Sequence, residues 1–306
     1  MNPETLPDEL ADLEARLTSE LLINLSELST EETAELAASW PEIGLSRRLQ
    51  ILSSLTDLVE DNVELNFDAV FKVALRDAEG PVRAAALRGL FEYEGRDLIP
   101  TLVGLLREDG DLEVRREAAI ALGRYALAVE MESIEGSDAA VVRATLFATV
   151  GDMEEDAWVR SRAIEAVGAI SGEETENLIE SVYGEEDFWM RLGAVDAMGR
   201  SCDETWLPIL ADEMRNEAPE MRYAAVFAAG SIGSADSVND LEALTRDEDA
   251  EVRVAAVHAL GEIGGPKARV VLNNLLYEGD DDLREAVEEA IAAIGIDEDP
   301  FRLRFP

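Results

Sequence analysis

Residues 247–265, DEDAEVRVAAVHALGEIGG, decide the fold of this 306-residue chain. A run of carboxylates leads into a segment whose apolar and small residues recur at the spacing of one helix face: Val252, Ala256, Ala259, Leu260 and Ile263. Two glycines follow this segment and end it. The stretch therefore predicts a short amphipathic α-helix with an acidic N-terminal turn.

The same profile recurs along the chain, and an arginine that follows an apolar residue marks each copy. These arginines, called the arginine ladder below, are Arg83, Arg115, Arg160, Arg191, Arg222, Arg253 and Arg284, and the last five follow one another at intervals of 31 residues. Six positions after each arginine stands glycine or alanine. Small side chains let another helix approach closely, and we expect this helix to be the leucine-rich segment that precedes most copies, such as residues 97–108. Each repeat is therefore predicted to be a helical hairpin.

A single hairpin cannot bury both of its apolar faces, so successive hairpins must stack. We therefore predict an all-α chain, an α-solenoid in the form of a right-handed superhelix of about eight hairpins. The expected segments are a capping helix in 1–29, degenerate repeats in 30–151 with an insertion near 128–138, regular repeats in 152–295, and a tail in 296–306. Arg115 and Arg160 are 45 residues apart, which is one repeat plus 14, so the insertion is expected to be a protruding loop.

The repeated segment resembles HEAT repeats, specifically the short bacterial subtype found in phycobilisome-lyase-like proteins, whose hallmark is an acidic turn followed by V-R-x-x-A-A-x-A-L-G-x-I. The resemblance covers roughly residues 62–295 and is most regular from residue 152 onward. It implies that the arginine ladder is structural. It also implies that the positions one and five residues after each arginine line a concave groove.

Composition excludes several classes of function. The chain has 26 basic and 67 acidic residues, a formal net charge of −41, which repels nucleic acids and anionic membranes. One cysteine and one histidine exclude an intrachain disulfide and any metal site with two imidazoles, and we expect Cys202 to be a buried thiol. No nucleophile elbow, phosphate-binding loop or dinucleotide motif is present. We therefore expect no enzymatic activity, no cofactor and no metal.

The N-terminus has neither a basic region nor an apolar run, which predicts a cytoplasmic protein without a membrane segment.

Carboxylates precede the ladder arginines, as Asp247 and Asp249 precede Arg253. They can cap the helix that follows, and the arginine can bridge to an acid of a neighbouring repeat.

The groove positions carry a candidate binding patch. Its predicted members are the apolar Leu192, Tyr223, Phe227 and Val254, with Asp196, Arg200 and His258 at the margin. Aromatic anchors with an acidic rim suit a basic or amphipathic peptide. The alternative is that these are scattered apolar residues of an ordinary surface.

A second candidate patch lies two residues before the arginine, where most repeats carry an acidic residue. Two consecutive repeats carry Trp158 and Trp189 instead, and Phe188 is beside the second. Equivalent positions in adjacent repeats are about one helix-packing distance apart, so the rings are expected to form an aromatic binding patch at the edge of the stack. The alternative is that both tuck under the 128–138 segment.

These patterns predict a non-enzymatic scaffold, monomeric or weakly homo-oligomeric, that presents its groove to a protein or peptide. Two alternatives stay open: an accessory subunit of a lyase that handles open-chain tetrapyrroles (bilins), which the resemblance implies, and a structural spacer in an assembly. The basic and aromatic tail, residues 299–306, either caps the last repeat or docks on another copy of the chain.

Overall fold

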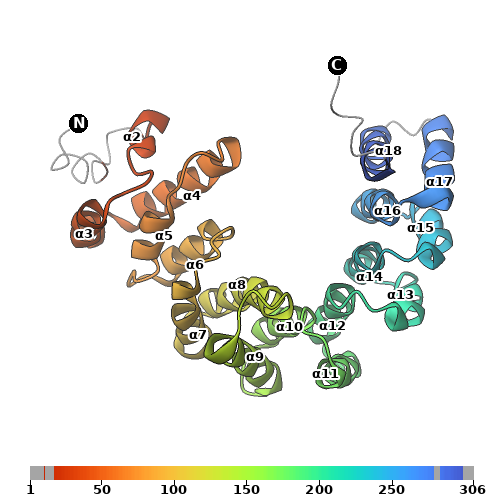
Figure 1. Ribbon diagram of the computed structural model, residues 1–306, viewed down its shortest axis with the longest axis horizontal. Coiled ribbons are helices and arrows are strands. Elements are labelled where there is room, and N and C mark those ends of the chain that lie inside the picture. Colours follow the sequence, from red (N-terminus) through yellow and green to blue (C-terminus); the bar gives the residue numbers. More distant parts are fainter. Residues whose placement is uncertain (1–9, 11–16, 279–282, 299–306) are drawn as a thin grey trace. The chain divides into compact units, whose positions relative to one another are not determined.

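The computed structural model describes residues 10, 17–278 and 283–298. Every regular element within them is a helix (Figure 1), so the chain is an all-α solenoid, as predicted. The described residues form eight hairpins, namely α3 (Thr30–Ser39) with α4 (Leu45–Asp61), α5 (Asp68–Ala74) with α6 (Gly80–Gly89), α7 (Ile99–Glu108) with α8 (Leu112–Glu130), α9 (Gly136–Gly151) with α10 (Ala157–Val167), α11 (Glu173–Tyr183) with α12 (Phe188–Arg200), α13 (Leu207–Glu213) with α14 (Pro219–Ile232), α15 (Val238–Leu244) with α16 (Ala250–Ile263), and α17 (Gly265–Glu278) with α18 (Arg284–Glu298).

Short elements complete the chain. Helix α2 (Ser19–Ile23) precedes the first hairpin, and the 3-10 turns η2 (Trp40–Glu42), η3 (Arg96–Leu98), η4 (Glu204–Trp206) and η5 (Ala235–Ser237) adjoin first helices. The chain folds into two compact units: residues 1–125 with 136–142, and residues 126–135 with 143–306. In the second of these units, the second helix of each hairpin lies in an inner row and the first helix of each hairpin lies in an outer row (Figure 1).

Helix α16 has the predicted amphipathic form. Val252, Ala256 and Leu260 are completely buried, and Ile263 is half-buried at the end of the stripe. The carboxylate of Asp249 accepts the backbone N–H groups of Glu251 and Val252, which caps the helix. The acidic turn therefore does the capping that its position in the sequence predicts.

Small residues bring consecutive second helices together. A Cβ atom added to Gly199 of α12 would lie 2.6 Å from the Cα atom of Ala228 in α14. The same contact recurs between Gly168 and Ala197, Gly230 and Ala259, and Gly261 and Ala290. We expected these small residues to face the first helix of their own hairpin. Gly89 does so, since a Cβ atom added to it would meet the Phe71 ring of α5, but four of the alanines do not. Ala197, Ala228, Ala259 and Ala290 instead meet a glycine in or just after the preceding second helix, because side chains larger than a methyl group would hold these two helices apart.

The expected protruding loop near 128–138 is non-helical only at residues 131–135. Helix α8 is 19 residues long and α9 is 16, and only residues 131–135 connect them. The extra residues lengthen the two helices because they continue the apolar pattern, with Ala126 and Val142 buried.

Two other expectations concern the ends of the chain and the single cysteine. Most of the predicted capping helix, residues 1–9 and 11–16, and the tail residues 299–306 lie outside the described residues. Cys202 is exposed, which contradicts the expectation of a buried thiol. It has a φ of 51° in the left-handed turn just after α12, so it lies outside the buried stripe of that helix.

Candidate protein-binding surface

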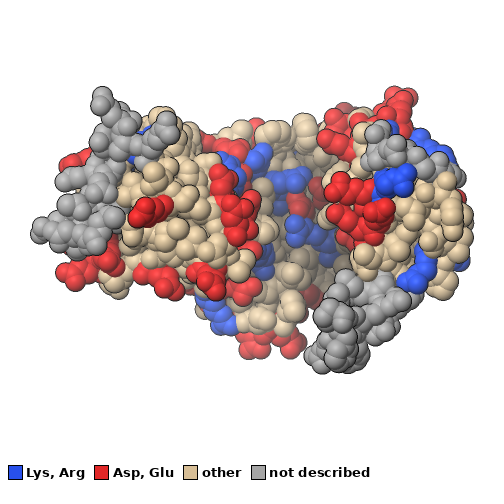
Figure 2. All heavy atoms as spheres, turned by 90° about the horizontal axis from the view of Figure 1, so that it is seen from above, with Lys and Arg blue, Asp and Glu red and all other residues tan. Residues whose placement is uncertain are grey.

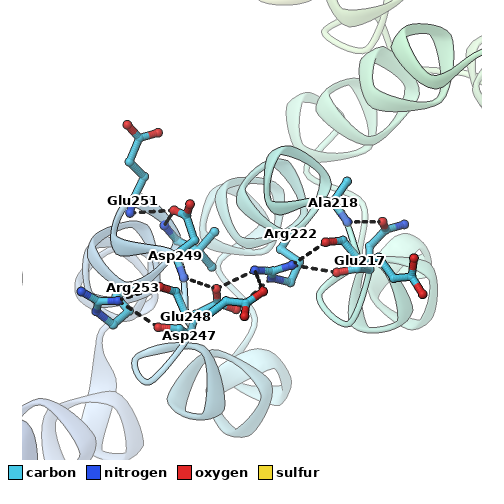
Figure 3. A network of polar contacts seen from close by, with 10 residues as sticks. Glu217, Ala218, Arg222, Asp247, Glu248, Asp249, Glu251 and Arg253 are labelled. Atoms are coloured by element: carbon cyan, nitrogen blue, oxygen red, sulfur yellow. Dashed lines mark hydrogen bonds and ion pairs between the residues drawn. The ribbon is translucent and has the colours of Figure 1, made fainter.

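The ladder arginine Arg222 joins two repeats through a buried ion pair (Figure 3). Its Nη2 and Nε atoms donate to the two carboxylate oxygens of Asp247, at 2.7 Å and 2.8 Å. Its Nη1 atom donates to the backbone carbonyls of Asn216 and Glu217, in the loop before α14. Because both charged side chains are only 8% exposed, this pair clamps the loop before α14 to the loop before α16.

The environment of Asp247 favours its charged form. Burial alone would raise the pKa of this carboxyl, but hydrogen bonds from Arg222 and from the backbone N–H of Asp249 outweigh it and lower the pKa. Arg253, the next ladder arginine, donates to the backbone carbonyls of Asp247 and Glu248 (Figure 3). The same loop thus receives arginines from two consecutive repeats.

Other ladder arginines make related contacts. The ion pairs are Arg83 with Asp109 at 2.6 Å, Arg160 with Glu185 at 3.0 Å, and Arg191 with Glu213 at 2.8 Å. Arg115 donates to the backbone carbonyl of Asp109, and Arg284 is exposed.

Arg48 of α4 is a further member of this series that the sequence pattern did not reveal, and it pairs with the buried carboxylate of Asp77. Trp40 donates to the same carboxylate. The dipeptide pattern hid Arg48 because Arg47, rather than an apolar residue, precedes it. The small Ser54, six positions after Arg48, is the signal that could have found it.

The predicted groove positions are only partly exposed. Tyr223 and Phe227 of α14 are 43% and 55% exposed, and they are neighbours on one helix face because they are four residues apart. On α16, Val254 is half-buried and His258 is exposed. We call Tyr223, Phe227, Val254 and His258 the inner face.

Leu192 does not contribute to this surface, contrary to expectation. It is buried, because α12 and α10 pack so closely at the next residue that a Cβ atom added to Gly193 would lie 2.6 Å from the carbonyl oxygen of Ser161. Two side chains at equivalent positions of the repeat, Leu192 and Tyr223, therefore have different exposures.

Asp196 and Arg200, predicted at the margin of the patch, belong to a network of charges on α10 and α12. Glu165 accepts ion pairs from Arg162 and Arg200, both at 2.7 Å, and Arg162 also pairs with Asp196 at 3.2 Å. Burial, with the charge of Glu165 added, raises the pKa of Asp196 to about 6. Basic side chains lie among carboxylates on the part of the surface over α10 and α12 (Figure 2).

Acidic residues also border the inner face, on the side of α18. The exposed side chains of Glu285 and Glu289 occupy the corresponding positions of α18. Figure 2 shows acidic side chains gathered over this helix. Tyr223 and Phe227 are therefore exposed aromatic residues between two helices that carry carboxylates.

Trp158 and Trp189 are in contact. Their ring centroids are 5.5 Å apart, with the planes at 90°. They do not tuck under the 128–138 segment. Glu130, at the end of α8, accepts the backbone N–H of Ser171, which follows the C-terminus of α10, whereas Trp158 is at the N-terminus of that helix.

The first unit holds a groove that sequence analysis missed. Its volume is about 970 Å³, and Val63, Phe91 and Arg124 are among its lining residues. Arg124 lies over the Phe91 ring and donates to the carbonyl of Leu90. This groove could not be predicted from helical periodicity, because Val63 and Phe91 are in connecting segments. No group of three possible metal ligands occurs in the part of the chain that the structure describes.

Fold and surface together define a helical-repeat protein with an exposed aromatic face. The profile described as HEAT repeats matches residues 67–148 and 207–292, more than half of the chain. The chain therefore belongs to the HEAT-repeat family, which confirms the resemblance seen in the sequence.

No curated protein sequence matches the chain. Among solved structures, it is similar to the CpcE and CpcF complex of phycocyanin lyase from Nostoc sp. PCC7120, with a TM-score of 0.56 and 18% identity over 93% of this chain and 97% of the other. It is also similar to Kap121p bound to Pho4p, with a TM-score of 0.50 and 15% identity over 96% of this chain and 38% of the other. These likenesses show the fold.

Among the residues that the structure describes, no helix combines the length and the apolar character that crossing a membrane requires.

Proposed function

We propose that this HEAT-repeat protein is a non-enzymatic scaffold whose inner face binds a cationic, amphipathic segment of a protein partner. HEAT repeats serve as scaffolds for protein interactions, and the solved Kap121p structure is of a complex with a protein partner. The observation that carries the proposal is the exposed pair Tyr223 and Phe227. Large aromatic residues are enriched among the residues that dominate interface energies.

The charge of the chain selects the chemistry of the partner. A net charge of −41 accelerates encounter with basic proteins and repels acidic ones. The exposed Glu285 and Glu289 would face basic residues that flank an apolar anchor. We further propose that the protein acts in the cytoplasm, as a monomer or a weak homo-oligomer.

Affinity capture from a lysate of the source organism, at that organism's own ionic strength, tests the proposal. The baits are the wild-type chain, the double variant Tyr223→Ala/Phe227→Ala, and the control Tyr277→Ala, which removes an exposed aromatic ring from the outer helix α17. We expect the double variant to bind the specific partner at least about thirty-fold more weakly than the other two baits do, because one hot-spot residue contributes about 2 kcal/mol or more and 1.4 kcal/mol is a factor of about ten. Equal capture by all three baits would refute the proposed surface.

A second candidate function is an accessory role in bilin attachment, which the fold likeness to the CpcE and CpcF complex favours. It predicts that an added open-chain tetrapyrrole binds saturably and shifts its visible absorbance band. The scaffold proposal predicts no such shift. A structural spacer, the third alternative, predicts neither a pigment nor a saturable protein ligand.

A further inference from the structure

Three aromatic rings meet nearly at right angles at the N-terminal ends of α10 and α12. Besides the perpendicular contact of Trp158 with Trp189, the ring centroids of Phe188 and Trp189 are 5.4 Å apart, with the planes at 80°. We call these three residues the aromatic corner. Trp158 and Trp189 remain 39% and 40% exposed, so the corner presents aromatic surface to solvent.

The repeat itself does not require aromatic residues at these positions. Two residues before the ladder arginine, other repeats carry the glutamates Glu113, Glu220 and Glu251, whose charged side chains are readily hydrated. The remaining tryptophans, Trp40 and Trp206, are buried. The repeat therefore forms without indoles at these positions, and clustered exposed rings are typical of binding sites.

The charges around the corner favour a cation over an anion. Both exposed tryptophans follow a run of carboxylates: Glu154, Glu155 and Asp156 before Trp158, and Glu185, Glu186 and Asp187 before Trp189. Of these, Glu185 is already paired with Arg160. The positive end of a helix would oppose a cation. Here, however, Asp156 accepts the backbone N–H of Trp158 and Asp187 accepts that of Met190, so a carboxylate caps each helix end. The face of an indole ring carries negative electrostatic potential, which attracts cations.

We infer that the aromatic corner binds an arginine side chain of a protein partner, with the guanidinium group packed against the indole rings. A guanidinium group is planar and weakly hydrated, so it stacks on aromatic rings more readily than an ammonium group does. This site is separate from the Tyr223 and Phe227 pair, and the inference holds or fails independently of the proposed function.

Peptide binding at low salt tests the inference. The probe is a dye-labelled glycine and serine peptide with two arginines, and its twin carries neutral citrulline in place of arginine. Fluorescence anisotropy measures the Kd for the wild-type chain, for Trp158→Leu/Trp189→Leu, for Trp158→Phe/Trp189→Phe, and for Tyr223→Ala/Phe227→Ala. All four proteins have the same net charge, so a difference between them does not arise from the overall acidic field.

We expect the leucine variant to bind the arginine peptide about two- to five-fold more weakly, since a cation over an exposed ring contributes about 0.5–1 kcal/mol. The phenylalanine variant should retain part of the affinity, and the inner-face variant all of it. Citrulline should bind the wild type no better than arginine binds the leucine variant. Equal affinities of the wild type and the leucine variant would overturn the inference, and so would equal affinities of the two peptides. Circular dichroism of each variant separates a lost contact from a lost fold.

Discussion

At the scale of single residues, the ladder arginines account for the most regular polar feature of the sequence. Arg222 and Asp247 are both removed from water, and the carboxylate pays for its burial through hydrogen bonds to a guanidinium and a backbone N–H. Removing one partner of such a pair leaves the other charge buried and unpaired. Removing a ladder arginine is therefore expected to destabilise the loops that it joins.

We expect Arg222→Ala to lower the free energy of unfolding at pH 7 by about 3 kcal/mol, because it leaves the Asp247 carboxylate buried without its counter-ion. Urea unfolding followed by circular dichroism measures the loss. Arg215→Ala is the matched control, since the side chains of Arg215 and Asp240 are 64% and 32% exposed and their pair is worth about 1 kcal/mol or less.

The effect of Arg222→Ala has a defined pH dependence. Hydrogen bonds from Arg222 and from a backbone N–H hold the folded-state pKa of Asp247 in the wild type below the ordinary aspartate value of about 3.8. The stability that the pair contributes is therefore present above that pH and is lost as the pH falls through the lower folded-state value. The gap between wild type and variant should narrow in acid, and a gap that does not change with pH would contradict the role given to Asp247.

At the scale of elements, the spacing of the second helices depends on paired small residues. Helices α12 and α14 approach where Gly199 meets Ala228, and the same arrangement repeats along the inner row. Backbone lies on both sides of this contact, so neither side can move aside as a flexible side chain would. These glycines are therefore required for close approach, whatever they cost in helix propensity.

Gly199→Ala should destabilise the second unit by about 1–3 kcal/mol, the usual cost of overpacking, because the new methyl group would lie 2.6 Å from the Cα atom of Ala228. Gly104→Ala in α7 is the control. No heavy atom lies within 4 Å of its added Cβ atom, so the substitution should stabilise by up to about 1 kcal/mol through helix propensity. The thermal unfolding midpoints of the two variants test this expectation. A midpoint that rises in both variants would show that the helices do not need the close contact.

At the scale of the whole molecule, the net charge of −41 makes folding electrostatically costly. Self-repulsion between exposed carboxylates acts over distances that salt shortens, with a Debye length of about 10 Å at 0.1 M and about 3 Å at 1 M. Buried pairs such as Arg222 with Asp247 are screened much less. Salt should therefore remove more repulsion than attraction.

Raising NaCl from about 0.1 M to about 1 M should increase the thermal unfolding midpoint by several degrees, because the shorter Debye length weakens the repulsion among surface carboxylates. Differential scanning calorimetry measures the shift, and Arg222→Ala should show a shift of similar size. A midpoint that falls with salt would mean that exposed ion pairs outweigh the repulsion.

The sequence alone determined the helical hairpin, its period and its capping, because these depend on side chains a few residues apart on one helix. Residue 252 and its equivalents are buried wherever the period repeats, so the fold could be predicted. Only the tertiary structure decided which side chains remain exposed. Leu192 and Tyr223 occupy the same position of the repeat, yet the close approach of α10 and α12 buries the first. The exposure of a side chain depends on the distance between its helix and the neighbouring helix. That distance is set by contacts between residues about 30 positions apart, such as Gly199 and Ala228.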